Sequence, residues 1–253
     1  MKPPRVLVIA GSDSSGGAGI QADIKTVTML GGYAMTAITA ITAQNTLGVS
    51  GVVALAPAVV GAQIDACLSD IGADAVKIGM LGSAAIGHAV ADRLERLDCP
   101  IVFDPVMVAT SGALLADAET VAAFERLMRL SAVTTPNVAE LAALGGNAGM
   151  AARGVGYLAK GGDAGGAVVE DRLVQPGRAP VVWRAERIET RHTHGTGCTL
   201  ASAIATGLGA GLPLEEAVAR GRDFVRAALI AAPGFGAGHG PLGHQAVRDQ
   251  SRS

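Results

Sequence analysis

The sequence predicts an α/β domain with a central, mostly parallel sheet and helices on both of its faces. Short runs rich in β-branched residues alternate along the chain with longer stretches whose apolar residues recur at helical spacing. Glycine-rich or polar segments follow several of the short runs. Apolar residues make up 49% of the chain and aromatic residues only 3%, a composition that suits close packing of helices on a sheet. Strands that alternate with helices are typical of a parallel sheet.

Length and composition narrow the possible classes of protein. The 253 residues suffice for one large α/β domain or two small ones. No linker or internal repeat is evident, so we expect one domain over residues 1–253. A net charge of −2 gives no reason to expect binding to nucleic acid or to an anionic membrane. No apolar run reaches the roughly 20 residues that span a bilayer, and residues 1–10 are not typical of a signal peptide.

The cysteines indicate a reducing compartment. Cys67, Cys99 and Cys198 are far apart in the sequence and lack the spacing of a metal site. We therefore expect a cytoplasmic location and no disulfide framework.

The first part of the chain contains a regular series of expected elements. Val6–Ala10 has the composition of a strand, and Gly19–Leu30 has apolar residues at helical spacing. Two strands are expected at Met35–Ala43 and Val49–Leu55, around a turn at Asn45–Gly48. The elements that follow are a helix at Pro57–Leu68, a strand at Ala75–Ile78, a helix at Ser83–Leu97 and a strand at Ile101–Asp104.

The second part continues this alternation. We expect a helix at Ala116–Leu130, a strand at Ala132–Thr134, a short helix at Val138–Leu144 and a strand at Val155–Lys160. Three small hairpin-like pieces are expected between Ala167 and Ile188, then helices at Thr196–Leu208 and Leu214–Ala232, and a frayed tail at about 245–253. Ligands of such sheets bind at the carboxyl ends of the strands.

The segment His192–Thr199 is the strongest functional motif. Gly195, Thr196 and Gly197 open an expected helix, whose first backbone N–H groups lack partners within the helix and can bind an anion. Cys198 lies on the first turn, where the helix dipole favours a thiolate. The alternative is a merely buried thiol. His192 and His194 are two residues apart, which favours a role in orienting the loop over binding a metal.

A glycine-rich loop, residues 10–19, follows the first expected strand. Its glycines permit close approach of a ligand to the backbone, but it contains neither a dinucleotide-binding motif nor a Gly-Lys-Ser/Thr phosphate loop. A flexible connection is an equally good interpretation. Asp23 lies one turn into the next helix, where it could bind a polar ligand or be a solvated carboxylate.

Three further polar motifs lie at strand ends. Asp104 ends an apolar strand, either facing the site or capping the next loop. Asn137 and Glu140 have the spacing of a helix capping box, but Glu140 could instead hold Mg²⁺ through water. Lys160 and Gly161 combine a cation with open backbone, which suits nucleotide phosphates, although most lysines are simply solvated.

Taken together, these motifs resemble those of the ribokinase-like superfamily. More closely, the chain resembles the bacterial hydroxymethylpyrimidine/phosphomethylpyrimidine kinases of thiamine biosynthesis. The resemblance covers nearly the whole chain. The matching segments are 10–25, 41–46, 77–81, 104–107, 135–140, 160–162, 193–200 and 238–241.

The resemblance implies a particular site, with ATP and Mg²⁺ as cofactors. A small β flap at about residues 35–55 would cover the substrate. Gly195, Thr196 and Gly197 match the anion hole of the family and Cys198 its active-site position. The pyrimidine would be held by Gly11, Ala18, Asp23, Gln44, Met80 and Val106 or Met107. Glu140 matches the residue associated with Mg²⁺, and the nucleotide side would comprise Asp104, Asn137, Lys160 and Gly161.

The implied activity is two successive phosphorylations: of 4-amino-5-hydroxymethyl-2-methylpyrimidine by ATP, then of its monophosphate to the pyrophosphate. A pyridoxal kinase of the same close family is the alternative, and a non-catalytic ligand-binding protein on the kinase fold is a remote one. Only nineteen residues separate Glu140 from Lys160, fewer than the resemblance implies, so the nucleotide preference stays open. Related kinases are often dimers, and a homodimer is expected.

Overall fold

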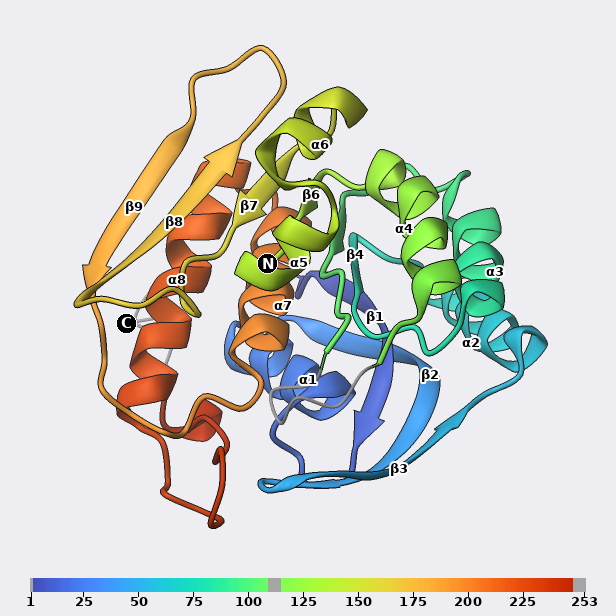
Figure 1. The fold of residues 1–253 in the computed structure, drawn as a ribbon. Coiled ribbons are helices and arrows are strands. Elements are labelled where there is room, and N and C mark those ends of the chain that lie inside the picture. Colours follow the sequence, from blue (N-terminus) through green and yellow to red (C-terminus); the bar gives the residue numbers. More distant parts are fainter. Residues whose placement is uncertain (1, 109–114, 248–253) are drawn as a thin grey trace.

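The computed structural model describes residues 2–108 and 115–247. Within these residues, nine strands form one sheet in the order β3-β2-β1-β4-β5-β6-β7-β8-β9 (Figure 1). The strands are β1 (Arg5–Asp13), β2 (Tyr33–Asn45), β3 (Gly48–Ala54), β4 (Ala75–Ile78), β5 (Ile101–Phe103), β6 (Val133–Thr134), β7 (Tyr157–Ala159), β8 (Val168–Val174) and β9 (Val181–Glu186).

The sheet is parallel in its centre and antiparallel at both edges. Strands β2, β1, β4, β5, β6 and β7 pair in parallel, whereas β3 pairs antiparallel with β2, and β8 and β9 form an antiparallel pair beside β7. The helices are α1 (Gly19–Met29), α2 (Pro57–Asp70), α3 (Ala84–Leu94), α4 (Ala118–Leu130), α5 (Val138–Ala143), α6 (Gly146–Arg153), α7 (Thr196–Gly209), α8 (Leu214–Ile230) and the short 3₁₀ helix η1 (His244–Ala246). The expected α/β architecture is confirmed.

Two apolar layers hold the helices on opposite faces of the sheet. Alternate residues of β1 enter different layers, because side chains of a strand point to opposite faces. Leu7 and Ile9 pack with residues of α2, α3 and α4, including Phe124, whose ring meets Phe103 edge to face at 5.0 Å. Val6 and Val8 pack with residues of α1, α7 and α8. The sheet is therefore covered on both faces, and functional groups collect at its carboxyl edge.

The segment that the sequence predicts as three hairpin-like pieces is one antiparallel pair, so that prediction is wrong. Strands β8 and β9 stay in register from the Val168–Glu186 pair to the Leu173–Val181 pair. Glu170, Arg172 and Arg184, between the apolar positions, are exposed on a regular edge ribbon, whereas Asp171 is buried. These polar residues give the sequence an interrupted pattern.

Helix α6 is absent from the sequence prediction. Gly146 and Gly149 disfavour a helix locally, but Met150 is fully buried and Arg153 Nη1 donates to the Leu144 carbonyl oxygen at 2.6 Å. Burial of one apolar side chain and this backbone contact outweigh the poor local propensity. The short segment before Lys160 thus still contains a helix.

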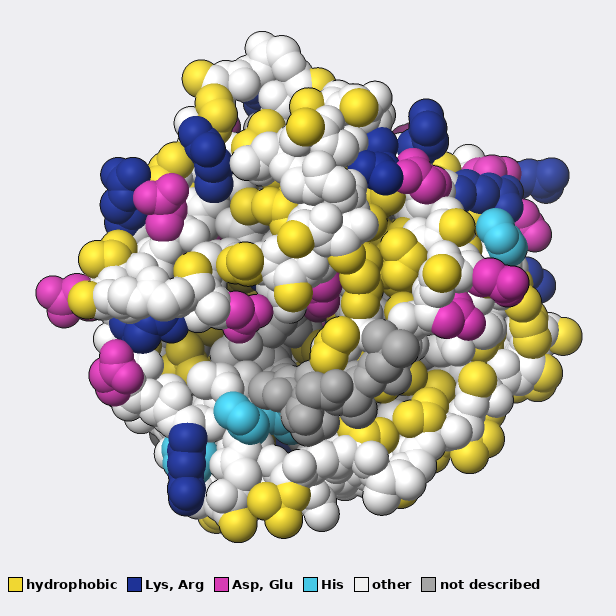
Figure 2. Space-filling view, in the orientation of Figure 1, with side chains coloured by type: hydrophobic (Ala, Val, Ile, Leu, Met, Phe, Trp, Pro, Cys, Tyr) yellow, Lys and Arg dark blue, Asp and Glu magenta, His cyan; other side chains and the backbone are white. Residues whose placement is uncertain are grey.

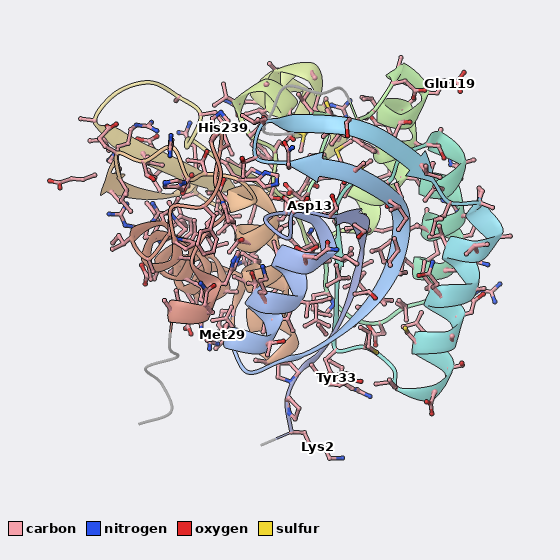
Figure 3. The ribbon with its side chains drawn as sticks, turned by 90° about the horizontal axis from the view of Figure 1, so that it is seen from below. Lys2, Asp13, Met29, Tyr33, Glu119 and His239 are labelled. Carbon is pink, nitrogen blue, oxygen red and sulfur yellow. The ribbon has the colours of Figure 1, made fainter. Side chains whose placement is uncertain are left out.

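The flap expected at about residues 35–55 corresponds to the antiparallel pair β2 and β3. Figure 3 shows this curved pair beside Asp13, at the end of β1. Of the tail expected to fray, residues 245–246 belong to η1, and residues 248–253 lie outside the described residues. No helix within the described part of the chain is both long and apolar enough to cross a membrane.

Candidate active site

A cavity of about 760 Å³ opens at the carboxyl edge of the sheet. Figure 2 shows the hollow near the centre of one face, with acidic and histidine side chains around it. Ends of β1 and β2 form one side of the cavity, and the start of α7 with the segments after β5, β6 and β7 forms the other. Of the residues expected in the site, those lining the cavity are Gly11, Ala18, Gln44, Met80, Asp104, Val106, Asn137, Glu140, Lys160, Gly195, Thr196, Gly197 and Cys198.

The start of α7 presents free backbone donors to this cavity. Gly195 has a φ of +89°, a left-handed conformation that glycine adopts without strain. A Cβ there would also collide with the carbonyl oxygen of Gly17. Among the described residues, the N–H groups of Gly197 and Cys198 have no protein acceptor. The positive end of the helix dipole reinforces these donors, which makes the position suitable for an anion.

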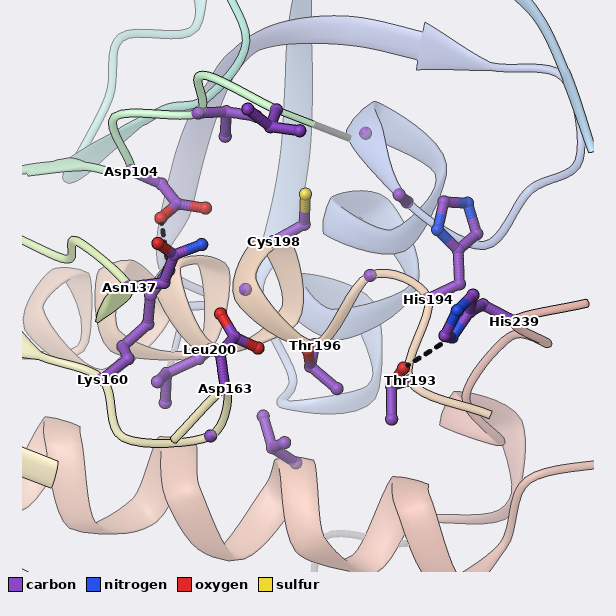
Figure 4. Close-up of a pocket in the computed structure, with 18 of the residues that line it drawn as sticks. Asp104, Asn137, Lys160, Asp163, Thr193, His194, Thr196, Cys198, Leu200 and His239 are labelled. Atoms are coloured by element: carbon purple, nitrogen blue, oxygen red, sulfur yellow. Dashed lines mark hydrogen bonds and ion pairs between the residues drawn. The ribbon is translucent and has the colours of Figure 1, made fainter. Parts of the chain in front are cut away.

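Cys198 lies between the two halves of the cavity (Figure 4). Burial raises the pKa of its thiol to about 11, although Lys77 and a hydrogen bond from the Gly19 N–H act to lower it. The expectation that the helix start favours a thiolate is therefore wrong for the free protein. Loss of water around the half-buried sulfur and the nearby carboxylates of Asp23 and Asp104 disfavour the anion.

One side of the cavity holds a cluster of charged groups. Lys160 Nζ lies 2.7 Å from Asp104 Oδ1, which also accepts a hydrogen bond from the Thr135 hydroxyl at 2.8 Å. Burial would lower the pKa of Lys160, but Asp104 and Glu140 raise it, so the ammonium group stays charged. A Cβ on Gly197 would lie 3.2 Å from Lys160 Nζ. The absence of a side chain at Gly197 thus keeps a fixed cation close to the free N–H groups of α7.

Asn137 and Glu140 form the capping box that their spacing predicts. The Glu140 N–H donates to Asn137 Oδ1 at 2.9 Å, and the Asn137 N–H donates to Glu140 Oε2 at 2.8 Å. Glu140 also faces the cavity, so the structural and functional interpretations are compatible. Burial raises the pKa of Glu140 to about 7, an effect that Lys160 opposes and Asp104 reinforces.

The opposite side of the cavity is lined by an amide and a histidine–carboxylate pair. Gln44, near the end of β2, lies beside His194, whose Nε2 is 2.8 Å from Asp13 Oδ2. Burial would raise the pKa of Asp13, but hydrogen bonds from His194, Ser15 and Ala18 outweigh it and lower the pKa. His194 orients this loop as its sequence context suggests, but its direct partners were not evident from spacing.

Comparison with known proteins identifies the family. The model of the family described as phosphomethylpyrimidine kinase matches residues 13–243. The chain belongs to the phosphomethylpyrimidine kinase family. It is 47% identical over 255 residues to the hydroxymethylpyrimidine/phosphomethylpyrimidine kinase of Rhizobium meliloti (strain 1021), with 94% of this chain and 96% of the relative covered. The family predicted from the motifs is thereby confirmed.

Two further proteins extend this comparison. The chain is 46% identical over 268 residues to the thiamine biosynthesis bifunctional protein ThiED of Geobacter sulfurreducens; 97% of this chain is covered, and it spans about half, 54%, of that relative. It is also similar to the pyridoxal kinase of Staphylococcus aureus in complex with AMP-PCP and pyridoxal. That comparison has a TM-score of 0.86 and 31% identity, with 99% of this chain and 95% of that chain covered.

Asp23, Met107 and Gly161 do not line the main cavity, unlike the other residues expected in the site. Asp23 is fully buried, where both of its carboxylate oxygens lie 2.9 Å from Lys77 Nζ and one accepts from Ser202 at 2.6 Å. Met107 is also buried. In this family member Asp23 therefore lies beneath the cavity, in an ion pair that sequence spacing alone did not indicate.

The backbone of Gly161 is held by a residue far along the chain. Its N–H donates to Asp171 Oδ1 at 2.9 Å, and Arg222 Nε donates to Asp171 Oδ2 at 2.7 Å. Asp171 on β8 and Arg222 on α8 both line the main cavity. No local motif marks either residue, because an isolated charge on a strand or helix ordinarily faces solvent.

Proposed function

We propose that this phosphomethylpyrimidine kinase family member transfers the γ-phosphoryl group of ATP to 4-amino-5-hydroxymethyl-2-methylpyrimidine, and then phosphorylates the resulting monophosphate. The observation that carries this proposal is the free N–H pair of Gly197 and Cys198, which faces one cavity between Lys160 and Gln44. Phosphoryl transfer depends on positioning and on compensation of the moving charge. The helix start and a nearby ammonium group supply both.

The side of the cavity that contains Lys160 is proposed to bind the nucleotide. Its cation suits phosphate oxygens, and the Staphylococcus aureus relative was solved with the ATP analogue AMP-PCP. Gly161, predicted to offer open backbone on this side, instead uses its N–H on Asp171. Asp104 and Asn137 complete this proposed nucleotide side, on which they line the cavity.

The same side of the cavity fits Mg²⁺ bound largely through water and phosphate. No group of three or more histidine, cysteine or acidic side chains able to hold a metal occurs in the described ranges. Glu140 Oε2 is occupied by the Asn137 N–H, which favours an indirect contact. Mg²⁺ commonly uses one or two carboxylates together with waters and substrate phosphates. Asp104 and Glu140 would hold the ion, which would neutralise charge on the phosphates.

The acceptor pyrimidine is proposed to lie on the Gln44 side. Gly11, Ala18, Met80 and Val106 line that part of the cavity, whereas Asp23 and Met107 would act from beneath it. An amide can both donate to and accept from an aminopyrimidine. Cys198 lies where it could take the proton of the hydroxymethyl group.

A pyridoxal kinase is the second candidate activity, since the Staphylococcus aureus relative binds pyridoxal with the same fold. ATP turnover measured with each heterocycle separates the candidates. We expect turnover with the pyrimidine and with its monophosphate, at a higher kcat/KM than with pyridoxal. Preference for pyridoxal would replace the proposed substrate, and ATP binding without turnover would indicate a non-catalytic protein.

We further propose a cytoplasmic homodimer that pairs through the flap. Thr42 lines the cavity, so the neighbouring Ile41 points to the outer face, where it pairs in register with Val53. Ile41 and Val53 are 45% and 65% exposed. Apolar residues on an edge ribbon are typical of an association surface. The described cysteines are all free, in keeping with a reducing compartment.

A further inference from the structure

The contact between His194 and Gln44 carries information about the substrate. Gln44 Nε2 lies 3.2 Å from His194 Nε2, and Gln44 Oε1 lies 3.2 Å from the Thr42 hydroxyl. All three side chains line the cavity and come from β2 and the loop before α7. The amide of Gln44 is therefore held between two fixed partners, whose donor and acceptor roles determine its orientation.

Asp13 determines the role of His194. Its Oδ2 accepts from the N–H groups of Gly17 and Ala18 at 3.1 and 2.8 Å, and Ser15 donates to both carboxylate oxygens. These donors lower the pKa of Asp13 despite its burial, so the group is an ionised acceptor at neutral pH. His194 Nε2, at 2.8 Å from Oδ2, must therefore carry a hydrogen.

A donor at His194 requires an acceptor on Gln44. Two N–H donors that face each other at 3.2 Å repel, and a half-turn of the amide places the Gln44 oxygen against His194 instead. The Gln44 nitrogen then donates to the Thr42 hydroxyl oxygen, whose own hydrogen is used on the Ser12 carbonyl at 2.9 Å. In this orientation the hydrogen on His194 Nε2 is shared between Asp13 Oδ2 and the Gln44 oxygen, and the second hydrogen of the Gln44 amide is left for a ligand.

The ring of His194 is itself fixed by packing. A Cβ on Gly17 would overlap the edge of the imidazole, so the ring occupies the space that a side chain at position 17 would need. His194 is almost fully buried, and its backbone N–H donates to the Gly240 carbonyl oxygen at 3.1 Å. The glycine-rich loop thus accommodates a protein side chain here. A histidine held in this way acts as a rigid reference for the Gln44 amide.

We propose that Asp13 and His194 are positioning residues that hold the Gln44 amide in one orientation, and that this orientation selects a ring with an amino group beside a ring nitrogen. The inference rests on the proposed function. An amino group donates and the adjacent ring nitrogen accepts, which matches the oxygen and nitrogen of an amide. The ring cannot turn over to match a reversed amide, because its hydroxymethyl group must reach the start of α7. Pyridoxal has no such amino group, so the amide orientation affects it little.

The test compares His194→Phe with His194→Gln, which keeps an N–H donor. For His194→Phe we expect the KM of the pyrimidine to rise about tenfold, with kcat unchanged and the KM of pyridoxal unaffected. For His194→Gln we expect a much smaller rise in the KM of the pyrimidine. His88→Phe, the same change on the exposed face of α3, is the matched control.

A double-mutant cycle separates positioning from a general structural effect. Gln44→Leu should raise the KM of the pyrimidine, and adding His194→Phe to that variant should raise it no further, because the amide is already absent. If His194→Phe does not fold, Thr42→Val removes the other partner of the amide and should produce the same selective rise. Equal losses for both heterocycles, or a further tenfold rise in the Gln44→Leu background, would overturn the inference.

Calorimetric binding of the pyrimidine distinguishes this inference from the proposed function. If the wild-type protein binds the pyrimidine without phosphorylating it, the proposed activity fails, and the same cycle is read from dissociation constants. If the wild-type protein does not bind the pyrimidine, both proposals fail.

Discussion

At the scale of single residues, Cys198 shows how two environments compete for one proton. The start of α7 favours a thiolate, whereas burial raises the pKa of the thiol to about 11. The thiolate is therefore a minor species at neutral pH. Each unit of pH below 11 reduces its fraction about tenfold. A base of this kind suits a loose transition state, in which the hydroxyl proton leaves late.

The two proposed phosphorylations should depend differently on Cys198. We expect Cys198→Ala to slow the first transfer by about 100-fold and the second much less, because a phosphate oxygen is already ionised near neutral pH. The first transfer in the wild-type protein should accelerate with pH up to about 11, since the pKa of the thiol lies there. Single-turnover rates from pH 7 to 10 measure both effects. Equal losses in the two steps, or parallel pH profiles, would contradict this role.

Burial of the Glu140 carboxylate beside the cavity should lower the stability of the fold where this group is ionised. Its folded pKa of about 7 lies above the ordinary value of 4.5, so its contribution to stability is complete below pH 4.5 and is lost as the pH rises through 7. Glu140→Gln keeps an acceptor for the Asn137 N–H without the charge. At pH 8 we expect its free energy of unfolding, measured with urea, to exceed that of the wild type by about 1–3 kcal/mol. At pH 4.5 we expect little difference between the two. A variant that is less stable at pH 8 would refute this account.

At the scale of elements, a buried ion pair joins three parts of the fold beneath the site. Lys77 on β4 and Asp23 on α1 are fully buried, and Ser202 on α7 donates to Asp23 at 2.6 Å. Ser202 is one turn after Cys198 on the same helix face. The network therefore fixes α7 relative to β4 and α1, the elements that end near Met80 and begin near Ala18.

Removing one member of this ion pair should destabilise the fold more than removing both members. Lys77→Met leaves Asp23 buried without a cation, which we expect to cost about 3–5 kcal/mol. The double variant Lys77→Met with Asp23→Leu leaves no buried charge of the pair, and should recover a large part of that loss. Urea unfolding of the two single variants and the double variant measures the coupling. Additive losses would show that the two charges act independently.

At the scale of the whole molecule, the curved flap has one face on the cavity and another exposed. Because Ile41 and Val53 share the outer face, a charge at either position should oppose pairing of two copies. We expect Val53→Asp to be monomeric at concentrations where the wild type is dimeric, as measured by light scattering after gel filtration. Val168→Asp is the matched control, because it changes a half-exposed valine on β8, near the opposite edge of the sheet. A monomeric wild type would refute the proposed dimer.

Local sequence patterns were sufficient for much of the architecture. The strand Ala75–Ile78 has the bounds that its apolar run predicts, and α7 begins at Thr196 as expected after the glycine at position 195. The capping box of Asn137 and Glu140 also follows from spacing alone. These features depend on backbone periodicity and on contacts within a few residues, which the sequence encodes directly.

Long-range contacts determined the features that local sequence patterns did not predict. Met150 stabilises α6 against its glycines by entering the core, and β8 follows its register with β9 instead of its interrupted pattern. The sequence by itself determined the family, the alternation of strands and helices outside α6 and the β8–β9 ribbon, and many of the residues that line the cavity. Only the tertiary structure decided that Cys198 is a protonated thiol, that Asp23 pairs with Lys77 and that His194 faces Gln44. The reason is that burial and charge depend on neighbours distant in the chain, which no local pattern contains.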